Sequence, residues 1–193
     1  MYLKAKQTRV EDGFFYKDKE GGLYAYVEDL AMKYYQREQS CRTLHIENAL
    51  MRHLLGLFLW KEIFDDTVPF VFQTPYQSAP LDLYYDSLFY EARKQKIDSR
   101  LHKIAKMGGA QREKEIQEIY VAKRGLKNPL IDWDSRKLTK EVLSSIAGLM
   151  DGRVLREVLL RLVGDIKTWS HGWPDLVCWN VKEKVVKFVE VKS

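Results

Sequence analysis

Three charged residues close together in the last part of the sequence, Asp175, Glu190 and Lys192, are of types that could do chemistry as a group. Two carboxylates can hold a hard divalent cation, and a neighbouring lysine can orient an attacking water molecule or, as a neutral amine, help to deprotonate it. Such chemistry requires the three side chains to lie side by side. The elements that carry them must therefore be identified first.

A β-hairpin over 171–193 would bring these residues together. The runs DLVCW and KVVKFVEVK are rich in β-branched and aromatic residues, and a polar stretch joins them. A turn centred between Lys182 and Glu183 makes Asp175 face Glu190 across the two strands. Directly opposed acids have Cβ atoms about 4.5 to 5.5 Å apart and repel each other unless a cation lies between them.

Strand alternation adds Lys192 to this pair, because residues two apart point to the same face at a spacing of about 6.5 Å. The two carboxylates and the backbone carbonyl of Val191 would then form an open Mg²⁺ site beside the Lys192 ammonium group. The alternative is a plain surface hairpin, in which Glu190 and Lys192 are solvated and Asp175 only caps a turn. The joint G-x-P-D and E-V-K pattern favours the site.

The rest of the chain predicts a helix-rich body. Apolar residues recur at helical spacing from Ala25 up to a polar break at 36–42, and Leu44–Phe64 is apolar around its whole circumference, as in a central buried helix. Three prolines make 67–80 an ordered loop. Further helices are predicted at 81–89, 97–106, 112–123, 139–150 and 154–163. Helices followed by a small sheet predict an α/β or α+β fold.

The composition excludes several classes of protein. The 193 residues, 46% of them apolar, suffice for one buried core, and the net charge of +5 favours an anionic partner. Cys41 and Cys178 lack the spacing of a metal site and indicate a reduced intracellular protein. No window reaches the roughly 18 apolar residues that span a bilayer, so neither secretion nor membrane insertion is expected.

Several motifs resemble a known family. HGWPDLVCWN followed by KFVEVKS resembles the virus-type replication-repair nuclease (VRR-NUC) domain, a branch of the PD-(D/E)xK superfamily. Upstream, YVEDLAMKYY, the 44–64 segment and VPFVFQTPYQSAPLDLYYDSLFY resemble the nuclease portion of the Fanconi-anaemia-associated nuclease family. The resemblance covers most of the chain, least distinctively at 94–137. It implies one nuclease domain over 1–193 with a restriction-endonuclease-like core, divided into a mainly helical part at 24–165 and the catalytic hairpin at 171–193.

The resemblance also implies functional residues. A glutamate at the start of the central helix joins the hairpin acids as a metal ligand in that family, and it falls here on Glu47. Spacing alone favours the interpretation of Glu47 as a carboxylate that stabilises a helix N-terminus, and the resemblance reverses this preference. The implied metal ligands are thus Glu47, Asp175, Glu190 and the Val191 carbonyl, with Asp175, Glu190 and Lys192 catalytic.

By the same resemblance, the expected activity is a structure-specific DNA nuclease of the 5′-flap endonuclease and 5′-exonuclease type, which uses Mg²⁺ or Mn²⁺ in interstrand crosslink repair. The expected partners are branched or 5′-flap duplex DNA and DNA-repair proteins, with no membrane. The expected location is the nucleus, or the cytoplasm for a bacterial source. The sequence does not indicate an oligomeric state.

Family members continue beyond E-V-K with a loop, a helix that carries a glutamine and a further strand, whereas the printed sequence ends at Ser193. Their zinc finger, SAP module and most tetratricopeptide-like helices have no counterpart here. We therefore expect a C-terminally truncated nuclease core. The alternative to an active enzyme is a catalytically weak fragment that binds DNA or a partner.

Other residues have two interpretations each. The four histidines could bind a metal or a phosphate, or simply pack. Tyr84 and Tyr85, with Asp82 and Asp86, could lie near the site or serve the core or surface. Trp173 could stack on a base or pack in its loop. Six basic residues could line a phosphate track or form a solvated helix face. The histidines are His45, His53, His102 and His171, and the basic residues are Arg93, Lys94, Lys96, Arg100, Lys103 and Lys106.

Overall fold

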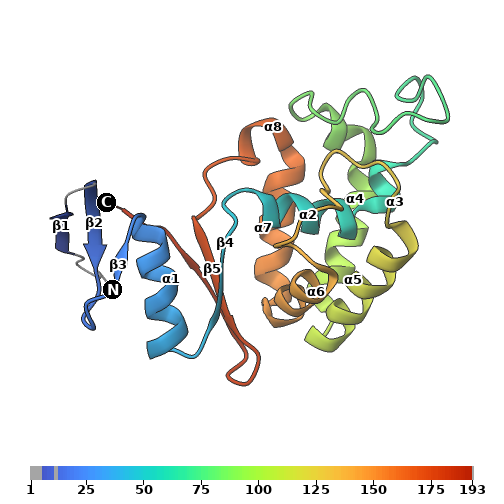
Figure 1. Ribbon diagram of the computed structural model, residues 1–193. Coiled ribbons are helices and arrows are strands. Elements are labelled where there is room, and N and C mark those ends of the chain that lie inside the picture. Colours follow the sequence, from blue (N-terminus) through green and yellow to red (C-terminus); the bar gives the residue numbers. More distant parts are fainter. Residues whose placement is uncertain (1–5, 11–12, 193) are drawn as a thin grey trace. The chain divides into compact units, whose positions relative to one another are not determined.

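The computed structural model describes residues 6–10 and 13–192 and has the mixed helix and sheet layout predicted from the sequence (Figure 1). The chain forms two compact units. The first unit combines the N-terminal residues up to Glu47 with the residues from Pro174 onward, and the second unit runs from Asn48 to Trp173. No helix among the described residues is both long and apolar enough to cross a bilayer.

The first unit contains two three-stranded antiparallel sheets and one long helix. One sheet has the strand order β1-β2-β3 and the other has the order β4-β5-β6. The elements are β1 (Lys6–Val10), β2 (Gly13–Lys17), β3 (Leu23–Tyr24), α1 (Val27–Glu38), β4 (Arg42–His45), β5 (Leu176–Asn180) and β6 (Val185–Val189). The helix α1 confirms the amphipathic helix predicted from Ala25 onward.

One face of the β4-β5-β6 sheet is apolar and packs against α1. Leu176 and Cys178 of β5 are fully buried there with Cys41, and burial raises the pKa of the Cys178 thiol to about 12. Around this cluster lie partly buried residues of α1 and of the last strand: Ala31, Met32, Tyr35, Val189 and Val191. Because neighbouring strand residues alternate in direction, Val177 and Trp179 of β5 belong to the opposite face, with their pairing partners Phe188 and Val186 of β6.

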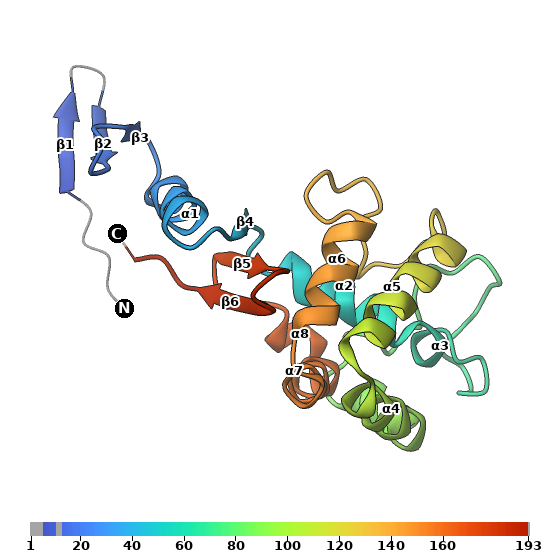
Figure 2. The same ribbon diagram turned by 90° about the horizontal axis from the view of Figure 1, so that it is seen from below.

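The second unit is entirely helical apart from its loops. Its helices are α2 (Ala49–Phe58), α3 (Trp60–Ile63), α4 (Leu88–Lys106), α5 (Gly109–Lys123), α6 (Lys140–Leu149), α7 (Gly152–Gly164) and α8 (Ile166–Trp169). The helix α2 contacts α5, α6 and α7, and α4 packs against α7 (Figure 2). Eight of the ten residues of α2 are buried, which confirms a central helix that is apolar on all sides.

The predicted helix over 44–64 is wrong at its start. Residues Arg42–His45 form β4, which pairs with β5, and α2 begins only at Ala49. The segment is apolar enough to suit a buried strand as well as a helix, and its pairing partner lies far away in the sequence. The turn between β4 and α2 contains Glu47, whose φ of 40° is incompatible with a right-handed helix.

The predicted helix over 81–89 is also wrong for most of its length. Residues 81–87 form turns, and α4 extends from Leu88 to Lys106, well before the predicted start at Ile97. Asp86 has a φ of 40°, which ends any helix there. The N-terminal half of α4 escaped prediction because Arg93, a charged residue, occupies a fully buried position of its inner face.

Candidate active site

The hairpin has the predicted register. Asn180 pairs with Val185 and Leu176 pairs with Val189, and the next position outward places Asp175 opposite Glu190. The pairing itself stops at Leu176 and Val189, so both acids lie just beyond the regular ladder. Asp175 and Glu190 are therefore outside the regular strand pairing, although they are opposite each other in its register.

The main chain fixes the carboxylate of Asp175. The backbone N–H of Val191 donates to its Oδ2 atom at 2.8 Å. This bond continues the contact between the two strands by one residue beyond the regular pairing. It holds the Asp175 carboxylate against the segment that carries Glu190 and Lys192.

The backbone of Glu47 reaches the same place from β4. The carbonyl oxygen of Asp175 accepts two hydrogen bonds, from the N–H of Ile46 at 3.1 Å and from the N–H of Glu47 at 3.3 Å. Two residues of one strand thus oppose one residue of the other, the arrangement of a β-bulge, which redirects a side chain. The structure therefore links Glu47 to Asp175 through the main chain, as part of a turn and not of a helix.

The Glu47 side chain itself is 60% exposed and lies near a histidine. Its Oε1 atom is 3.4 Å from Nε2 of His45, the last residue of β4. Asn48 between two apolar runs is the sequence signal for this turn, because asparagine favours turns, although the left-handed residue is Glu47 and Asn48 has φ −77°. His45, which was predicted to lie in the central helix, is instead the last residue of β4 and lies next to Glu47.

Lys192 and Glu190 lie on the face of the hairpin segment opposite α1. Val189 and Val191 pack on the apolar cluster beneath α1, so the residues that alternate with them point the other way. Both Glu190 and Lys192 are exposed. The structure thus places all the predicted site residues at one end of the β4-β5-β6 sheet, within a single unit.

These residues fit a hard divalent cation in chemical type, since carboxylate and carbonyl oxygens are the ligands it prefers. Within 6–10 and 13–192, however, no three His, Cys, Asp or Glu side chains gather closely enough to hold a metal ion. Glu47 and Glu190 are exposed, so each has room to turn toward the fixed carboxylate of Asp175. The ligand set therefore stays a prediction.

Two other candidates have structural partners within the second unit. His53 is buried; its Nδ1 lies 2.8 Å from the carbonyl oxygen of Ala49, and its Nε2 accepts the N–H of Asp132 at 3.0 Å. The Trp173 indole N–H donates to the Trp169 carbonyl at 2.8 Å. These contacts favour the packing interpretation of both residues. His102 and His171 are exposed.

The six basic residues at 93–106 do not form one track. Arg93 is fully buried, donates two hydrogen bonds to Asp82 and lies 4.3 Å from the ring centre of Phe89. Its role is to hold the loop before α4 onto that helix, and Asp82 serves the same contact. Tyr84 and Tyr85 are exposed, as a surface role requires. The remaining five basic residues lie on the exposed surface of α4 or in a pocket described below.

Comparison with known proteins identifies relatives of the chain. Residues 108–193 match the family model of the VRR-NUC domain. Over 167 residues the chain is 36% identical to Fanconi-associated nuclease 1 of Mus musculus, and over 171 residues it is 37% identical to the homolog of Schizosaccharomyces pombe. Both alignments include 86% of this chain but only 16% and 23% of the relatives, so the chain spans less than a quarter of their length.

The fold is shared with solved structures of a related nuclease. Two crystal structures of paFAN1, bound to 5′-flap DNA with a gap, superpose with a TM-score of 0.74 at 29% and 30% identity. Each covers 87% of this chain and 29% of the paFAN1 chain. The resemblance read from the motifs is confirmed, and the chain is a relative of the Fanconi-associated nuclease family whose residues 108–193 match the VRR-NUC domain.

Proposed function

We propose that this chain is the catalytic part of a metal-dependent, structure-specific DNA nuclease that hydrolyses phosphodiester bonds. One observation carries the proposal: Asp175 and Glu190 are opposed at the end of the hairpin, and the Asp175 carbonyl is hydrogen-bonded to the turn that carries Glu47. These main-chain contacts bring together, at one end of the sheet, the ends of the three strands that carry Asp175, Glu190 and Glu47.

The relatives support the substrate class. The matched proteins are nucleases by name, and the matched paFAN1 structures contain 5′-flap DNA. We therefore propose branched or 5′-flap duplex DNA as the substrate, cut as a 5′-flap endonuclease or 5′ exonuclease, and interstrand crosslink repair as the setting. The same family resemblance supports one nuclease domain over 1–193, DNA-repair proteins as partners and the nucleus as the location.

Each residue has a distinct role in this proposal. Asp175, Glu190, Glu47 and the Val191 carbonyl would hold Mg²⁺ or Mn²⁺, which when bound supplies positive charge for the phosphoryl oxygens and lowers the pKa of a water ligand. The Val191 N–H keeps the Asp175 carboxylate in place. The Lys192 side chain would orient the attacking water, receive its proton when Lys192 is a neutral amine, or stabilise the extra negative charge of the transition state when it is an ammonium group.

A cleavage assay tests the proposal. A 5′-end-labelled flap duplex is incubated with the protein in Mg²⁺, in Mn²⁺ and in EDTA, and Asp175→Ala, Glu190→Ala and Lys192→Ala are compared with the wild type. We expect cleavage in both metals, none in EDTA, and losses of roughly 10²-fold or more in each variant. Glu183→Ala is the matched control, because Glu183 is an exposed acid at the turn end of the same hairpin. Full activity of Asp175→Ala would refute the mechanism.

The alternative function is DNA or partner binding without efficient cleavage. It is favoured by the separation of the exposed carboxylates, since no three metal-type ligands gather among the residues that the structure describes. Binding of the flap duplex by wild type and Asp175→Ala alike, with no cleavage by either in Mg²⁺ or Mn²⁺, would establish this alternative.

A further inference from the structure

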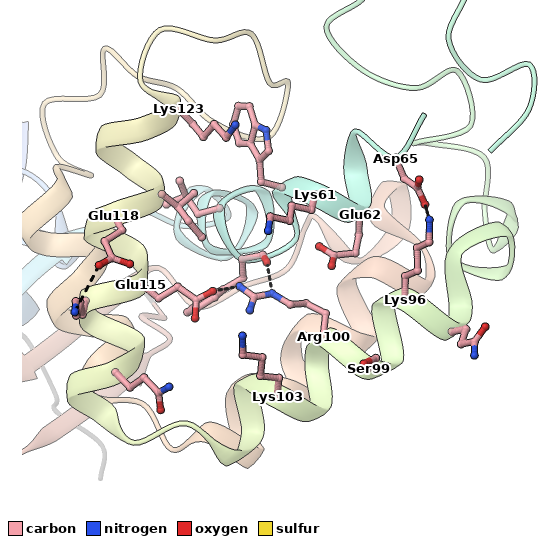
Figure 3. A pocket seen from close by; sticks show the side chains of 17 residues that line it. Lys61, Glu62, Asp65, Lys96, Ser99, Arg100, Lys103, Glu115, Glu118 and Lys123 are labelled. Carbon is pink, nitrogen blue, oxygen red and sulfur yellow. Dashed lines mark hydrogen bonds and ion pairs between the residues drawn. The ribbon is translucent and has the colours of Figure 1, made fainter. Parts of the chain in front are cut away.

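A pocket of about 1000 Å³ lies in the second unit, on the surface formed by α3, α4 and α5 (Figure 3). We call it the basic pocket, because six Lys or Arg residues line it against four Asp or Glu residues. The basic residues are Lys61, Lys96, Arg100, Lys103, Lys114 and Lys123. It is built entirely from residues between Leu57 and Lys123, so it belongs to one unit and is separate from the hairpin site.

Two of the lysines are neutralised by neighbouring acids. Lys96 lies 2.6 Å from Asp65, which is buried, and Lys114 lies 3.7 Å from Glu118 one helical turn away. The first pair is anchored, because Lys96 also donates to Thr67 at 2.9 Å. Both pairs line the basic pocket. Its net positive charge therefore comes from the other lining residues.

Arg100 is held in a fixed position at the centre of the basic pocket. Its Nε donates to the carbonyl of Phe58 at 2.8 Å, and its Nη2 forms an ion pair with Glu115. The Arg100 and Glu115 side chains are only 13% and 20% exposed, so solvent weakens this pair less than it weakens a surface pair. Arg100 thus presents a rigid guanidinium edge to the basic pocket.

Within the part of the chain that the structure describes, Lys61 and Lys103 lack a carboxylate partner, as does Lys123, which instead lies over the ring of Trp60. Lys61 and Lys103 are both exposed, and no carboxylate of the described residues lies within 4.0 Å of either ammonium group. Figure 3 shows both side chains extending toward Arg100 from different helices. No carboxylate within the described ranges offsets the charge of these two ammonium groups, and an anion bound between them would do so.

The acid nearest to these cations does not offset them fully. Glu62 is partly buried, its Oε2 atom has no hydrogen-bond partner, and burial raises the pKa of its carboxyl group. A carboxyl group with a raised pKa carries less negative charge at a given pH. Burial thus acts against the negative charge of Glu62, whereas the nearby Arg100 and Lys61 act in its favour.

Neither of the two aromatic residues that line the basic pocket, Phe58 and Trp60, offers a stacking surface, and Phe58 is only 1% exposed. Trp60 is 8% exposed, and the Lys123 ammonium group lies 5.6 Å from the centre of its ring. A nucleobase would need an open ring face to stack on. The chemistry of the basic pocket thus suits phosphate groups and not bases.

We propose that the basic pocket binds the phosphate backbone of a nucleic-acid duplex, through Lys61 and Lys103 on either side of the fixed Arg100. This inference rests on the proposed function as a DNA nuclease, and it adds a second contact with the substrate away from the scissile bond. Lysine ammonium groups on flexible stems suit this task, since they contact phosphates as point charges without reading sequence.

Salt-dependent binding tests the proposal. The affinity of the wild type for a labelled 5′-flap duplex is measured in EDTA by fluorescence anisotropy across a salt series, beside Lys61→Ala/Lys103→Ala. Each lost phosphate contact lowers the slope of log affinity against log salt by about 0.9 and weakens binding roughly tenfold at 0.1 M salt. We therefore expect a slope lower by about 2. The matched control is Lys106→Ala/Lys127→Ala, which removes two exposed lysines outside the basic pocket.

A calorimetric titration with inorganic phosphate tests whether the basic pocket binds free phosphate instead of the phosphates of a DNA backbone. Phosphate binding that Lys61→Ala/Lys103→Ala abolishes, with an unchanged DNA salt slope, would assign the basic pocket to free phosphate and overturn the proposal. Equal slopes for wild type and Lys61→Ala/Lys103→Ala, or an equal loss in the control, would also overturn it, while cleavage by the wild type would leave the proposed function intact. A wild type that neither binds nor cleaves the duplex would refute both.

Discussion

Replacing Glu47 should separate the stability of the protein from its activity. The residue has a φ of 40°, in the left-handed region, where a side chain costs about 1–2 kcal/mol. Glycine removes that cost but loses about 0.5–1 kcal/mol through the greater freedom of its unfolded chain. Glu47→Gly should therefore exceed Glu47→Ala in stability by about 0.5–1 kcal/mol, although both lack the carboxylate.

The difference can be measured by thermal unfolding followed by circular dichroism. For a chain of this size, 1 kcal/mol corresponds to a shift of roughly 2–4 °C in Tm, so the glycine variant should unfold about 1–4 °C above the alanine variant. Cleavage of the flap duplex should fall by roughly 10²-fold or more in both, if Glu47 is a metal ligand. Activity and stability would then change in opposite directions at one residue.

Lys184 provides the matched control. It has a φ of 53° in the exposed turn of the hairpin, away from the carboxylates. Lys184→Gly should likewise be more stable than Lys184→Ala, but both should cleave DNA as the wild type does. Equal stability of Glu47→Ala and Glu47→Gly would show that Glu47 does not have a left-handed backbone. The β-bulge at Ile46 and Glu47 would then be refuted as well.

Three further predictions concern the second unit. Asp82→Ala should cost about 3–5 kcal/mol in urea unfolding, because it leaves the buried Arg93 charge unpaired, and a loss below about 1 kcal/mol would contradict this. Burial lowers the pKa of His53, so the wild type should lose stability as pH falls below 6.5, and His53→Gln should flatten that dependence. Asp151→Ala should cost about 1 kcal/mol, because Asp151 caps α7; an unchanged urea midpoint would refute the cap.

The hairpin and its two acids could be predicted because the information is local. The strands β5 and β6 are joined by a four-residue polar turn, so the turn fixes the register and the register places Asp175 opposite Glu190. No distant part of the chain is needed for that step. Lys192 follows from the same alternation.

The environment of Glu47 could not be predicted in the same way. The strand β4 exists because it pairs with β5, whose residues lie more than 130 positions later in the sequence. Nothing in the apolar run from Leu44 distinguishes a strand of four residues from the first turn of a helix. The start of α4 was mispredicted for a different reason. Arg93 is buried and hydrogen-bonded to Asp82, so a charged residue interrupts the apolar pattern of the helix.

The hydrogen bond between the two ends of the second unit has a consequence for the order of folding. The backbone N–H of Trp173 donates to Oδ1 of Asn48 at 3.2 Å, although the residues are 125 positions apart in the sequence. Closing a flexible loop of that length costs about 3 kcal/mol more than closing a short turn. The helices of the second unit lie between β4 and β5 in the sequence. If they fold first, their packing offsets the entropy cost of closing this loop before β4 and β5 pair.

During synthesis, β5 and β6 leave the ribosome after the helices. The end of the sheet that carries Glu47 and Asp175 would then form last, after the helices have brought Asn48 and Trp173 together. Pulse-labelled hydrogen exchange should accordingly show protection of α2 and α7 before protection of β4. In the unfolded or half-made chain, Glu47, Asp175 and Glu190 would therefore not yet lie at one end of a sheet.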